Sequence, residues 1–340
     1  MQAVILAGGF GTRLAPLTYT RPKPMLPILN KPMIHHLIDS LPQETEIILA
    51  TNYKTEQIKE YFEKLGREIT INKEPEPLGT GGATKYAGHY IDGTFMVLNG
   101  DIISSLNVRK FIQFHKENRA MATISLWPVK NVWEFGVVDL KTDGRITKFV
   151  EKPRKEDAPS NLINAGAYCL EPEILDYIED GKMVSMEKEI FPRIINEGKR
   201  FYGYTFNGFW IDVGRPSSYI EVNKILLERN GLENAVGERC EVDGRLEKSC
   251  IGNDTSIGKK SRVISSVIYE NSTIGSNCII ENCIIGSDCN IGDNVVLRNV
   301  IVGDGEAAET GQKFENEKIW RKTIPDGYPE KQVGNALADN

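Results

Sequence analysis

Apolar residues in the first 130 positions alternate between short unbroken runs and helical spacings. Strands are predicted at residues 3–7, 46–50, 68–72, 95–98 and 121–127, and the first of them is an unbroken apolar run, typical of a strand buried on both faces. Between them, the stretch 55–65 repeats its apolar residues at the spacing of one helix face, with Thr55 as a candidate cap. Helices are also predicted over 31–41, with Pro32 in the first turn, and after Asn107 as the cap. This alternation predicts βαβ units, a mainly parallel sheet flanked by helices, and ligand binding outside the carboxyl ends of the strands.

The pattern changes after residue 130. Two apolar runs at 135–138 and 146–150, joined by a turn at 141–144, predict a hairpin that extends the sheet with antiparallel strands. A further strand is predicted at 201–206, and Pro216 suits the first turn of a helix that reaches about Arg229.

A period of 17 residues governs the C-terminal part. Aliphatic residues recur at this spacing in three rows, which are Ile251, Ile268, Ile285 and Val302; Ile257, Ile274 and Ile291; and Val263, Ile280 and Leu297. Three inward rows describe the three faces of a prism, so the period predicts a parallel β-helix of hexapeptide type with three or four turns. We assign the domains as 1–232, 238–304 for the β-helix, and a polar tail at 305–340 that Ile319 and Trp320 anchor.

Composition narrows the class of protein. The 340 residues carry a net charge of −6, and no apolar run or N-terminal leader pattern predicts a membrane span or secretion, so we expect a cytoplasmic protein. The six cysteines form no C-x-x-C pair and are expected to be free thiols in the core.

The first strand leads into a loop that contains Gly8, Gly9 and Gly11. No Lys-Ser or Lys-Thr follows, and Leu14 replaces the third glycine of a dinucleotide fingerprint, so neither a Walker loop nor NAD binding is predicted. Glycine backbone that approaches an anion closely, with Arg13 beside it, indicates a polyphosphate cradle; the alternative is a tight turn with one surface arginine.

The charge of the early segment supports the cradle. Residues 1–38 contain no acidic residue and four basic ones, Arg13, Arg21, Lys23 and Lys31, which favours an anionic ligand over nucleic acid. Neighbouring prolines stiffen the backbone around Lys23, whose alternative role is a solvated loop lysine.

Four later stretches carry candidate chemistry. A second glycine loop, 78–83, opens a helix. Asp101 follows a predicted strand, where it could bind a metal or cap a turn, and Glu151 and Lys152 form an adjacent pair that could be merely exposed. Asp212 precedes a predicted helix and could stabilise its first turn.

The stretch AGGFGTRLAPLTYTRPKPMLPILNKPM resembles the signature of the sugar-1-phosphate nucleotidyltransferases, and in particular its mannose-1-phosphate guanylyltransferase branch. The resemblance implies a nucleotide-diphospho-sugar transferase fold followed by a left-handed β-helix. It also implies the transfer of a nucleotidyl group from an NTP to a sugar-1-phosphate with Mg²⁺, most simply mannose-1-phosphate and GTP. Glucose-1-phosphate uridylyl- or thymidylyltransferase is the alternative, because a single pocket contact can reverse the preference among sugars. Gly81, which departs from the common L-G-T-A-G-A motif of the base loop, also leaves the base open.

The resemblance also assigns roles to individual residues. Arg13 and Lys23 would be catalytic, and Asp101 and Asp212 would hold the metal. The nucleotide would contact Leu6, Ala7, Gly8, Gly9, Gly11, Thr12, Gly79, Thr80, Gly82 and Gly100. The sugar phosphate would contact Gly136, Glu151, Lys152, Asn164 and Gly166.

Two other functions compete with this assignment. Hexapeptide β-helices often belong to acyltransferases, but the repeat contains no histidine that could act as a base, so we expect a structural and oligomerising role for it, in a homo-oligomer without nucleic-acid or membrane partners. Non-catalytic relatives in translation-factor exchange complexes tend to lose the catalytic positions, whereas Arg13, Lys23, Asp101, Lys152 and Asp212 all match here.

Overall fold

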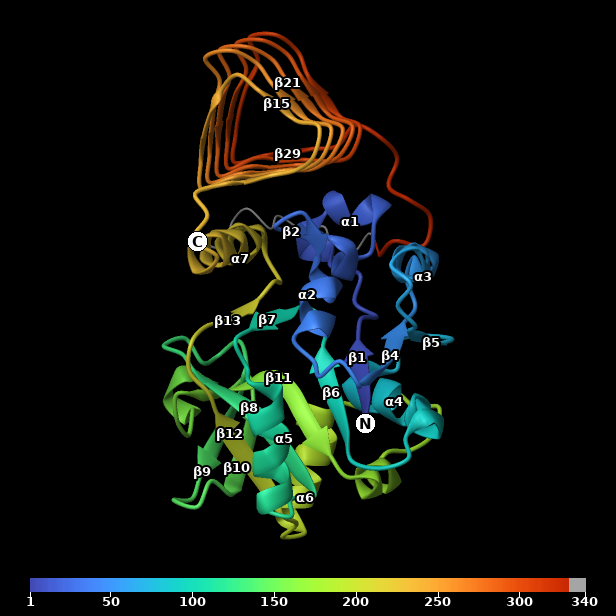
Figure 1. The fold of residues 1–340 in the computed structure, drawn as a ribbon. Coiled ribbons are helices and arrows are strands. Elements are labelled where there is room, and N and C mark those ends of the chain that lie inside the picture. The colour runs from blue at the N-terminus through green and yellow to red at the C-terminus, as the bar shows by residue number, and fades with distance from the viewer. Residues whose placement is uncertain (330–340) are drawn as a thin grey trace. The chain divides into compact units, whose positions relative to one another are not determined.

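The computed structural model describes residues 1–329, which form two compact units (Figure 1). The first unit comprises Met1–Gly9 and His36–Ile211, and the second comprises Phe10–His35 with the described chain from Asp212 onward. The chain therefore passes from one unit to the other inside the first glycine loop. By their contacts, residues 10–35 belong with the β-helix rather than with the strands that flank them in sequence.

A nine-stranded sheet forms the centre of the first unit. The order is β10-β9-β11-β6-β1-β4-β5, with β8 joined to β11 and β12 to β8. The strands are β1 Gln2–Leu6, β4 Glu46–Thr51, β5 Thr70–Lys73, β6 Phe95–Asn99, β8 Ala122–Pro128, β9 Gly136–Leu140, β10 Ile146–Glu151, β11 Leu162–Leu170 and β12 Phe201–Thr205. β1 is parallel to both β4 and β6, and β9 and β10 form the antiparallel hairpin, which confirms the predicted mixed, mainly parallel architecture.

Helices connect these strands. They are α2 Met33–Asp39, α3 Thr55–Lys64, α4 Gly79–Tyr86, η3 Gly88–Tyr90, α5 Val108–Glu117, η4 Lys155–Asp157, η5 Pro172–Tyr177, η6 Met186–Ile190 and α6 Phe191–Asn196. The side chain of Asn107 accepts a hydrogen bond from the Lys110 amide at 3.0 Å, so the predicted cap is confirmed. The predicted cap at Thr55 is wrong, because Thr55 is the first helical residue and Lys54 occupies the cap position.

The sequence analysis missed β11, which lies between β6, β8 and β9. All but two of its residues are buried, and its pairing with β8 is irregular between Asn164 and Tyr168. Gly166 has a φ of +73° at this irregularity. Asparagine and glycine, here Asn164 and Gly166, are more typical of loops than of strands, so the sequence does not predict a strand here. Tyr168 and Leu170 nevertheless belong to the buried core of the unit.

The second unit begins with a folded segment, residues 10–35. It contains η1 Thr12–Leu14, α1 Leu17–Thr20, η2 Lys23–Met25, β2 Pro27–Ile28 and β3 Lys31–Pro32. Lys31 and Pro32 pair with β2, so the predicted helix over 31–41 starts two residues late, at Met33. Further along the chain, β7 Ile102–Ser104 pairs with β13 Trp210–Asp212, and α7 spans Pro216–Arg229 as predicted.

The C-terminal strands stack into three parallel sheets that form the triangular coils in Figure 1, which fits the left-handed β-helix that the resemblance implies. One sheet consists of β14 Ala235–Val236, β17 Cys250–Ile251, β20 Val267–Ile268, β23 Ile284–Ile285, β26 Ile301–Val302 and β29 Lys318–Ile319. The second consists of β15 Glu241–Val242, β18 Ser256–Ile257, β21 Thr273–Ile274, β24 Asn290–Ile291 and β27 Ala307–Ala308. The third consists of β16 Arg245–Glu247, β19 Arg262–Ile264, β22 Ile279–Glu281, β25 Val296–Arg298 and β28 Lys313–Glu315.

The β-helix is longer than the aliphatic period indicates. Six strands stack in its largest sheet, against the three or four turns expected, and strands continue to Ile319 where a polar tail was expected from residue 305. The last coil keeps the period but not the residue type, because Ala308 and Phe314 replace the aliphatic residues of two rows. Ile319 is buried and Trp320 packs edge-on against Tyr19, which confirms both expected anchors. The part of the tail from residue 330 lies outside the described residues.

Small polar side chains and thiols fill the interior corners of the coils. Ser249, Ser261 and Ser266 are buried and hydrogen-bond to backbone of the same and adjacent coils. All six cysteines are free thiols as expected, and burial raises the pKa of Cys283 to about 12. No helix among residues 1–329 is long and apolar enough to cross a bilayer.

Arg21 fastens the early segment to the β-helix within the second unit. Its guanidinium donates to Asp304 at 3.0 Å, Ser287 at 2.6 Å and Glu270 at 3.3 Å, and it stacks over Tyr269. Burial lowers the pKa of Arg21, but the carboxylates of Asp304 and Glu270 raise it by more. Arg21 therefore neutralises acidic residues of the β-helix and does not contribute to a cationic patch for an external anion.

Replacing Arg21 by Ala is expected to destabilise the protein by about 2 kcal/mol, because the largely buried carboxylate of Asp304, the more exposed carboxylate of Glu270 and a hydroxyl lose their common donor. Urea unfolding monitored by fluorescence measures the effect. Arg298, whose exposed side chain donates to Glu281 at 2.9 Å, provides the control, and its replacement by Ala should cost less than about 0.5 kcal/mol. Equal stability of the two variants would contradict the role of Arg21 as a fastening residue.

Candidate functional site

The first unit brings the carboxyl ends of three parallel strands together. Leu6 at the end of β1 is in register with Ala50 of β4 and Asn99 of β6. Beyond the strands, the Ala7 amide donates to Ala50 at 2.8 Å and the Gly100 amide donates to Leu6 at 2.9 Å. The backbone that begins the glycine loop therefore lies beside the backbone that leads to Asp101, as expected for a ligand site on a parallel sheet.

Gly100 allows this close approach. A β-carbon at Gly100 would lie 2.7 Å from the Leu6 carbonyl oxygen, too close for any other residue. Asp101 follows in the turn between β6 and β7, where both expected roles, metal ligand and turn cap, have their place. The carboxylate thus stands at the tip of a buried strand.

The second glycine loop packs against protein. The amides of Gly81 and Gly82 donate to the Val184 carbonyl oxygen at 2.8 and 3.2 Å, and a β-carbon at Gly82 would lie 2.4 Å from the Lys182 carbonyl oxygen. A β-carbon at Gly81, which departs from the family motif, would lie 3.0 Å from the Val184 carbonyl oxygen. Gly81 and Gly82 therefore allow α4 to pack closely against residues 182–184. Gly79, which has a φ of +72°, and Thr80 precede them in the first turn of the helix.

The predicted sugar-phosphate residues gather on β9, β10 and β11. Gly136 is the register partner of Glu151, and a β-carbon at Gly136 would lie 2.8 Å from a Glu151 carboxylate oxygen. Lys152 has a φ of +49° and donates its amide to Phe135, so its exposed side chain leaves the strand at an unusual angle. Burial, and then the charge of Glu187, raise the pKa of Glu151.

Glu187, which the sequence analysis missed, links the two predicted subsites. Its carboxylate accepts from Thr80 at 2.7 Å and from Tyr168 at 2.9 Å, and the Tyr168 hydroxyl in turn accepts from Asn164 at 2.9 Å. Asn164 also accepts from the Gly166 amide at 3.0 Å. The network joins the second glycine loop to two of the predicted sugar-phosphate residues, and no sequence spacing points to it because its members are up to about a hundred residues apart.

A second missed group surrounds Gly8. A β-carbon at Gly8 would lie 3.6 Å from both the Asn52 side-chain oxygen and a Glu74 carboxylate oxygen. Glu74 is 6% exposed and accepts from the Leu78 amide, and burial raises the pKa of its carboxyl. The buried oxygen of Asn52 and side-chain nitrogen of Asn72 have no hydrogen-bond partner within residues 1–329. A ligand beside Gly8 would therefore meet the buried, unpartnered oxygen of Asn52 and the buried carboxylate of Glu74.

The second unit holds the remaining loop residues. Gly11 has a φ of +69°, and a β-carbon there would lie 2.9 Å from Thr18 and 3.0 Å from Lys23. Lys23 is 7% exposed in η2, between Pro22 and Pro24, so it is not a solvated loop lysine. Thr12 and Arg13 form η1 directly after Gly11.

Arg13 and Asp212 meet around Gly214. A β-carbon at Gly214 would lie 2.8 Å from an Arg13 guanidinium nitrogen and 3.0 Å from an Asp212 carboxylate oxygen. A larger residue at position 214 would displace both side chains. The second unit therefore places a guanidinium and a carboxylate side by side, next to the loop.

The donors suit a hard cation such as Mg²⁺. Within residues 1–329 no three His, Cys, Asp or Glu side chains gather as metal ligands. Mg²⁺ bound with substrate phosphates needs only one or two protein carboxylates, and Asp101 and Asp212 are residues of the type that it prefers. The resemblance-based metal assignment thus fits the residue types present.

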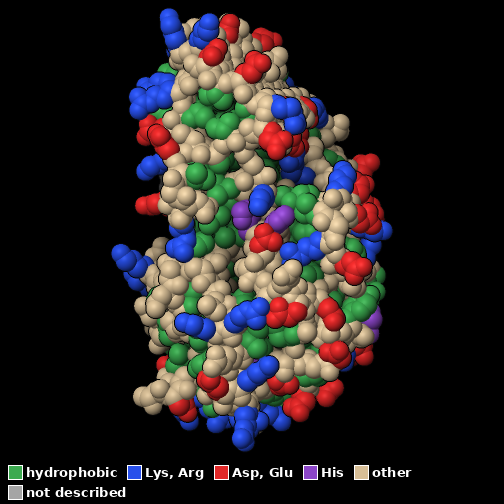
Figure 2. Space-filling view, in the orientation of Figure 1, with side chains coloured by type: hydrophobic (Ala, Val, Ile, Leu, Met, Phe, Trp, Pro, Cys, Tyr) green, Lys and Arg blue, Asp and Glu red, His purple; other side chains and the backbone are tan. Residues whose placement is uncertain are grey.

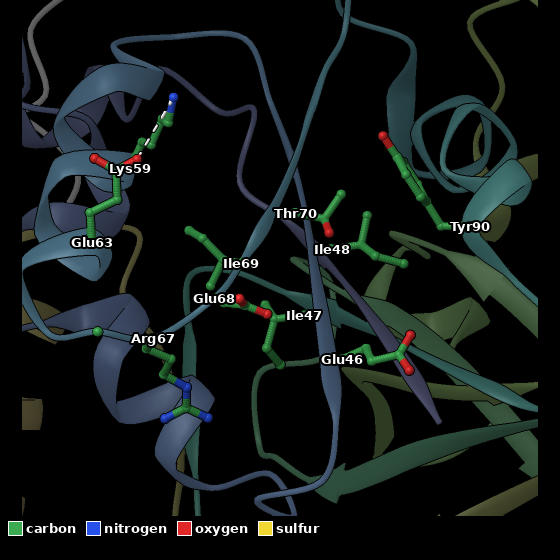
Figure 3. A pocket seen from close by; sticks show the side chains of 11 residues that line it. Glu46, Ile47, Ile48, Lys59, Glu63, Arg67, Glu68, Ile69, Thr70 and Tyr90 are labelled. Carbon is green, nitrogen blue, oxygen red and sulfur yellow. Dashed lines mark ion pairs between the residues drawn. The ribbon is translucent and has the colours of Figure 1, made fainter.

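A hollow of about 770 Å³ in the first unit lies elsewhere (Figure 3). Its lining comes from the start of β4, from α3 and the segment before β5, and from Tyr90, and includes none of the candidate residues. Lys59 and Glu63 form an ion pair at its rim. Ligand sites of parallel sheets lie at the carboxyl ends of strands, whereas Glu46 begins β4, so we do not assign this hollow to the reaction. Figure 2 shows both charge signs mixed over the face in view.

Comparison with known proteins identifies the class. Residues 2–229 match the family described as Nucleotidyl transferase, and residues 232–323 match the GMPPB C-terminal domain. The chain belongs to the nucleotidyl transferase family, and its fold and enzyme class are those expected from the signature.

Curated relatives narrow the resemblance. The chain is 42% identical to a probable mannose-1-phosphate guanylyltransferase 2 of Oryza sativa subsp. japonica, over 76% of this chain and 75% of the relative. It is 34% identical to a mannose-1-phosphate guanylyltransferase of Mycobacterium tuberculosis, over 79% and 80%. HddC from Yersinia pseudotuberculosis, solved in complex with GMP-PN, is 33% identical with a TM-score of 0.55, covering 66% of this chain and 99% of that one.

Proposed function

We propose that this protein transfers a guanylyl group from GTP to mannose-1-phosphate, giving GDP-mannose and pyrophosphate. The observation that carries the proposal is the pair of buried polar groups beside Gly8, Asn52 and Glu74, on the loop where the signature expects the nucleotide. The names of the relatives support the same substrates.

Glu74 suits guanine better than other bases. An ionised carboxylate only accepts hydrogen bonds, and guanine presents two adjacent donors, N1–H and the 2-amino group. Uracil and thymine present one donor between two carbonyl oxygens, and adenine presents an acceptor beside its amino group. Glu74 would therefore pair with guanine and repel the alternatives, with Asn52 and Asn72 as further partners.

The chemistry needs positioning and charge rather than a base. An oxygen of the sugar phosphate, already ionised, attacks the α-phosphorus of GTP in line, and the bond to the pyrophosphate oxygen breaks. Arg13 and Lys23 would bind the triphosphate, Lys152 the attacking phosphate, and Glu151 the sugar hydroxyls. Mg²⁺ held by Asp101 and Asp212 would supply charge stabilisation at the phosphates.

The remaining assignments belong to the same proposal. The nucleotide would lie along Leu6, Ala7, Gly8, Gly9, Gly11 and Thr12, with Gly79, Thr80, Gly82 and Gly100 around it. A homo-oligomer formed through the β-helix and a cytoplasmic location complete the proposal, and the six free thiols support a reducing compartment.

Pyrophosphate release tests the proposal directly. GTP, ATP, UTP, CTP and dTTP are each combined with mannose-1-phosphate and glucose-1-phosphate in the presence of Mg²⁺. The highest kcat/KM is expected for GTP with mannose-1-phosphate. A higher value for UTP or dTTP with glucose-1-phosphate, or no release with any pair, would contradict it.

Replacing Glu151 by Gln is expected to raise the KM for mannose-1-phosphate about 10- to 100-fold at pH 7.5, because charge-assisted hydrogen bonds to the sugar are lost. The raised pKa of Glu151 also predicts that the wild-type KM rises as the pH falls and the carboxylate is protonated. In the variant, we expect the KM for mannose-1-phosphate to change with pH only as the phosphate group of the substrate titrates.

The same substitution should not destabilise the fold. A carboxyl whose pKa is raised on folding stabilises the protein below its unfolded pKa and loses that contribution as the pH rises, so Glu151→Gln should be at least as stable at pH 7.5. Thermal unfolding provides this control. Identical pH profiles of KM in both proteins would refute the role of Glu151.

A further inference from the structure

The described end of the chain packs on the segment that continues the first glycine loop, all within the second unit. Tyr328 is 4% exposed, and its ring meets Tyr19 and Phe10 edge-on, with centroids 4.7 and 5.9 Å apart. Trp320 lies against Tyr19 at 5.2 Å. The match to the C-terminal domain family ends at residue 323, so the contact made by Tyr328 is outside both family matches.

Tyr328 also reaches the loop through a buried hydrogen bond. Its hydroxyl lies 2.7 Å from the Thr18 hydroxyl, which donates to the Gly11 carbonyl oxygen at 3.1 Å. When Thr18 spends its single hydroxyl proton on Gly11, the Tyr328 hydroxyl donates to Thr18, since its other acceptor, the Phe10 carbonyl oxygen, is more distant at 3.5 Å. The Gly11 carbonyl accepts a second bond from the Leu14 amide at 2.9 Å.

This chain of bonds sets the direction of one peptide plane. In a trans peptide the carbonyl and the following N–H point in opposite directions, so fixing the Gly11 carbonyl inward turns the Thr12 N–H outward. An outward N–H attracts phosphate, whereas a flipped peptide would present a carbonyl oxygen and repel it. Gly11, at a φ of +69°, is the residue where such a flip costs least.

We propose that Tyr328 is a positioning residue for the triphosphate, which acts through Thr18 to hold the Gly11–Thr12 peptide in its phosphate-binding orientation. The C-terminal segment from Trp320 to Tyr328 is then part of the nucleotide site without touching the nucleotide. The kinetic part of this inference rests on the proposed function.

Two variants and a control test the inference. Tyr328→Phe keeps the ring but removes the donor, and Thr18→Val removes the relay. We expect each to raise the KM for GTP about 5- to 10-fold, the effect of one neutral hydrogen bond, while the KM for mannose-1-phosphate changes less than about twofold. The double variant should be no worse than Thr18→Val. Tyr177→Phe, which removes an exposed bond to Glu197, should change neither KM.

Hydrogen exchange separates this inference from the proposed function. The Leu14 amide should exchange faster in Tyr328→Phe than in wild type without any nucleotide, because its acceptor is no longer fixed. If the wild type uses another NTP, the KM for that NTP is measured in place of the KM for GTP. If it uses no NTP, the proposed function is wrong, and hydrogen exchange at Leu14 alone tests the positioning role. Unchanged exchange at Leu14, or equal increases in both KM values, would overturn the positioning role.

Discussion

Replacing Lys23 by Ala is expected to lower kcat/KM for GTP and mannose-1-phosphate by roughly 10³-fold, the loss typical when one preorganised charged group that stabilises a transition state is removed. Lys23 is buried in a short helix between prolines, and its aliphatic stem packs on Gly11. Its ammonium group is thus preorganised and needs little reordering when the triphosphate arrives. Pyrophosphate release at saturating Mg²⁺ measures the loss.

Two companion variants isolate the charge. Lys23→Met keeps most of the stem, so it should unfold at nearly the wild-type temperature yet lose as much activity as Lys23→Ala. Lys31→Ala removes an exposed lysine from the same acid-free segment and should leave kcat/KM within about twofold, as expected for a surface residue. Near-normal activity of Lys23→Met would show that the ammonium group takes no part in the reaction.

Replacing Glu74 by Gln is expected to lower kcat/KM for GTP about 10²- to 10³-fold, because the amide matches only one of the two guanine donors and turns its own donor toward the other. The preference for GTP over ITP, which lacks the 2-amino group, should fall in the variant. Parallel measurements with GTP, ITP and ATP give both quantities.

Glu76 provides the matched control for Glu74. It lies two residues away and is exposed, so Glu76→Gln should keep both the rate and the preference for GTP. Burial raises the pKa of Glu74, so the affinity of the wild type for GTP should also fall at acidic pH, as the carboxylate is protonated, and this dependence should vanish in Glu74→Gln. An unchanged ratio of GTP to ITP would remove Glu74 from base recognition.

The catalytic signature is local, which is why the sequence carries it. The strand at 2–6, the glycines after it and the lysine between prolines are neighbours in the chain, so their identity and spacing suffice to recognise the loop. The same holds for the 17-residue period, since each coil repeats the environment of the coil before it. The period weakened in the last coil, where Ala308 and Phe314 took the place of larger aliphatic residues, and in the first coil, where Val236 pairs with Ile251 only 15 residues on.

Residues that act across the sheet were not recognisable in this way. Glu187 lies in a helical segment that no apolar period separates from its surroundings, and it meets Thr80 and Tyr168 because α4 and β11 pack against that segment. Arg21 looked like part of a cationic patch, and the acids that neutralise it come from coils some 250 residues later.

The sequence alone predicted the parallel sheet, the phosphate loop, the β-helix and the family, because each is recognised by a periodicity or a motif that lies within a few tens of consecutive residues. The tertiary structure alone decided that Glu74 and Asn52 share a dry space at Gly8 and that Tyr328 closes on Thr18. A buried polar contact between distant segments has no period, and its energy exists only once both segments are desolvated together.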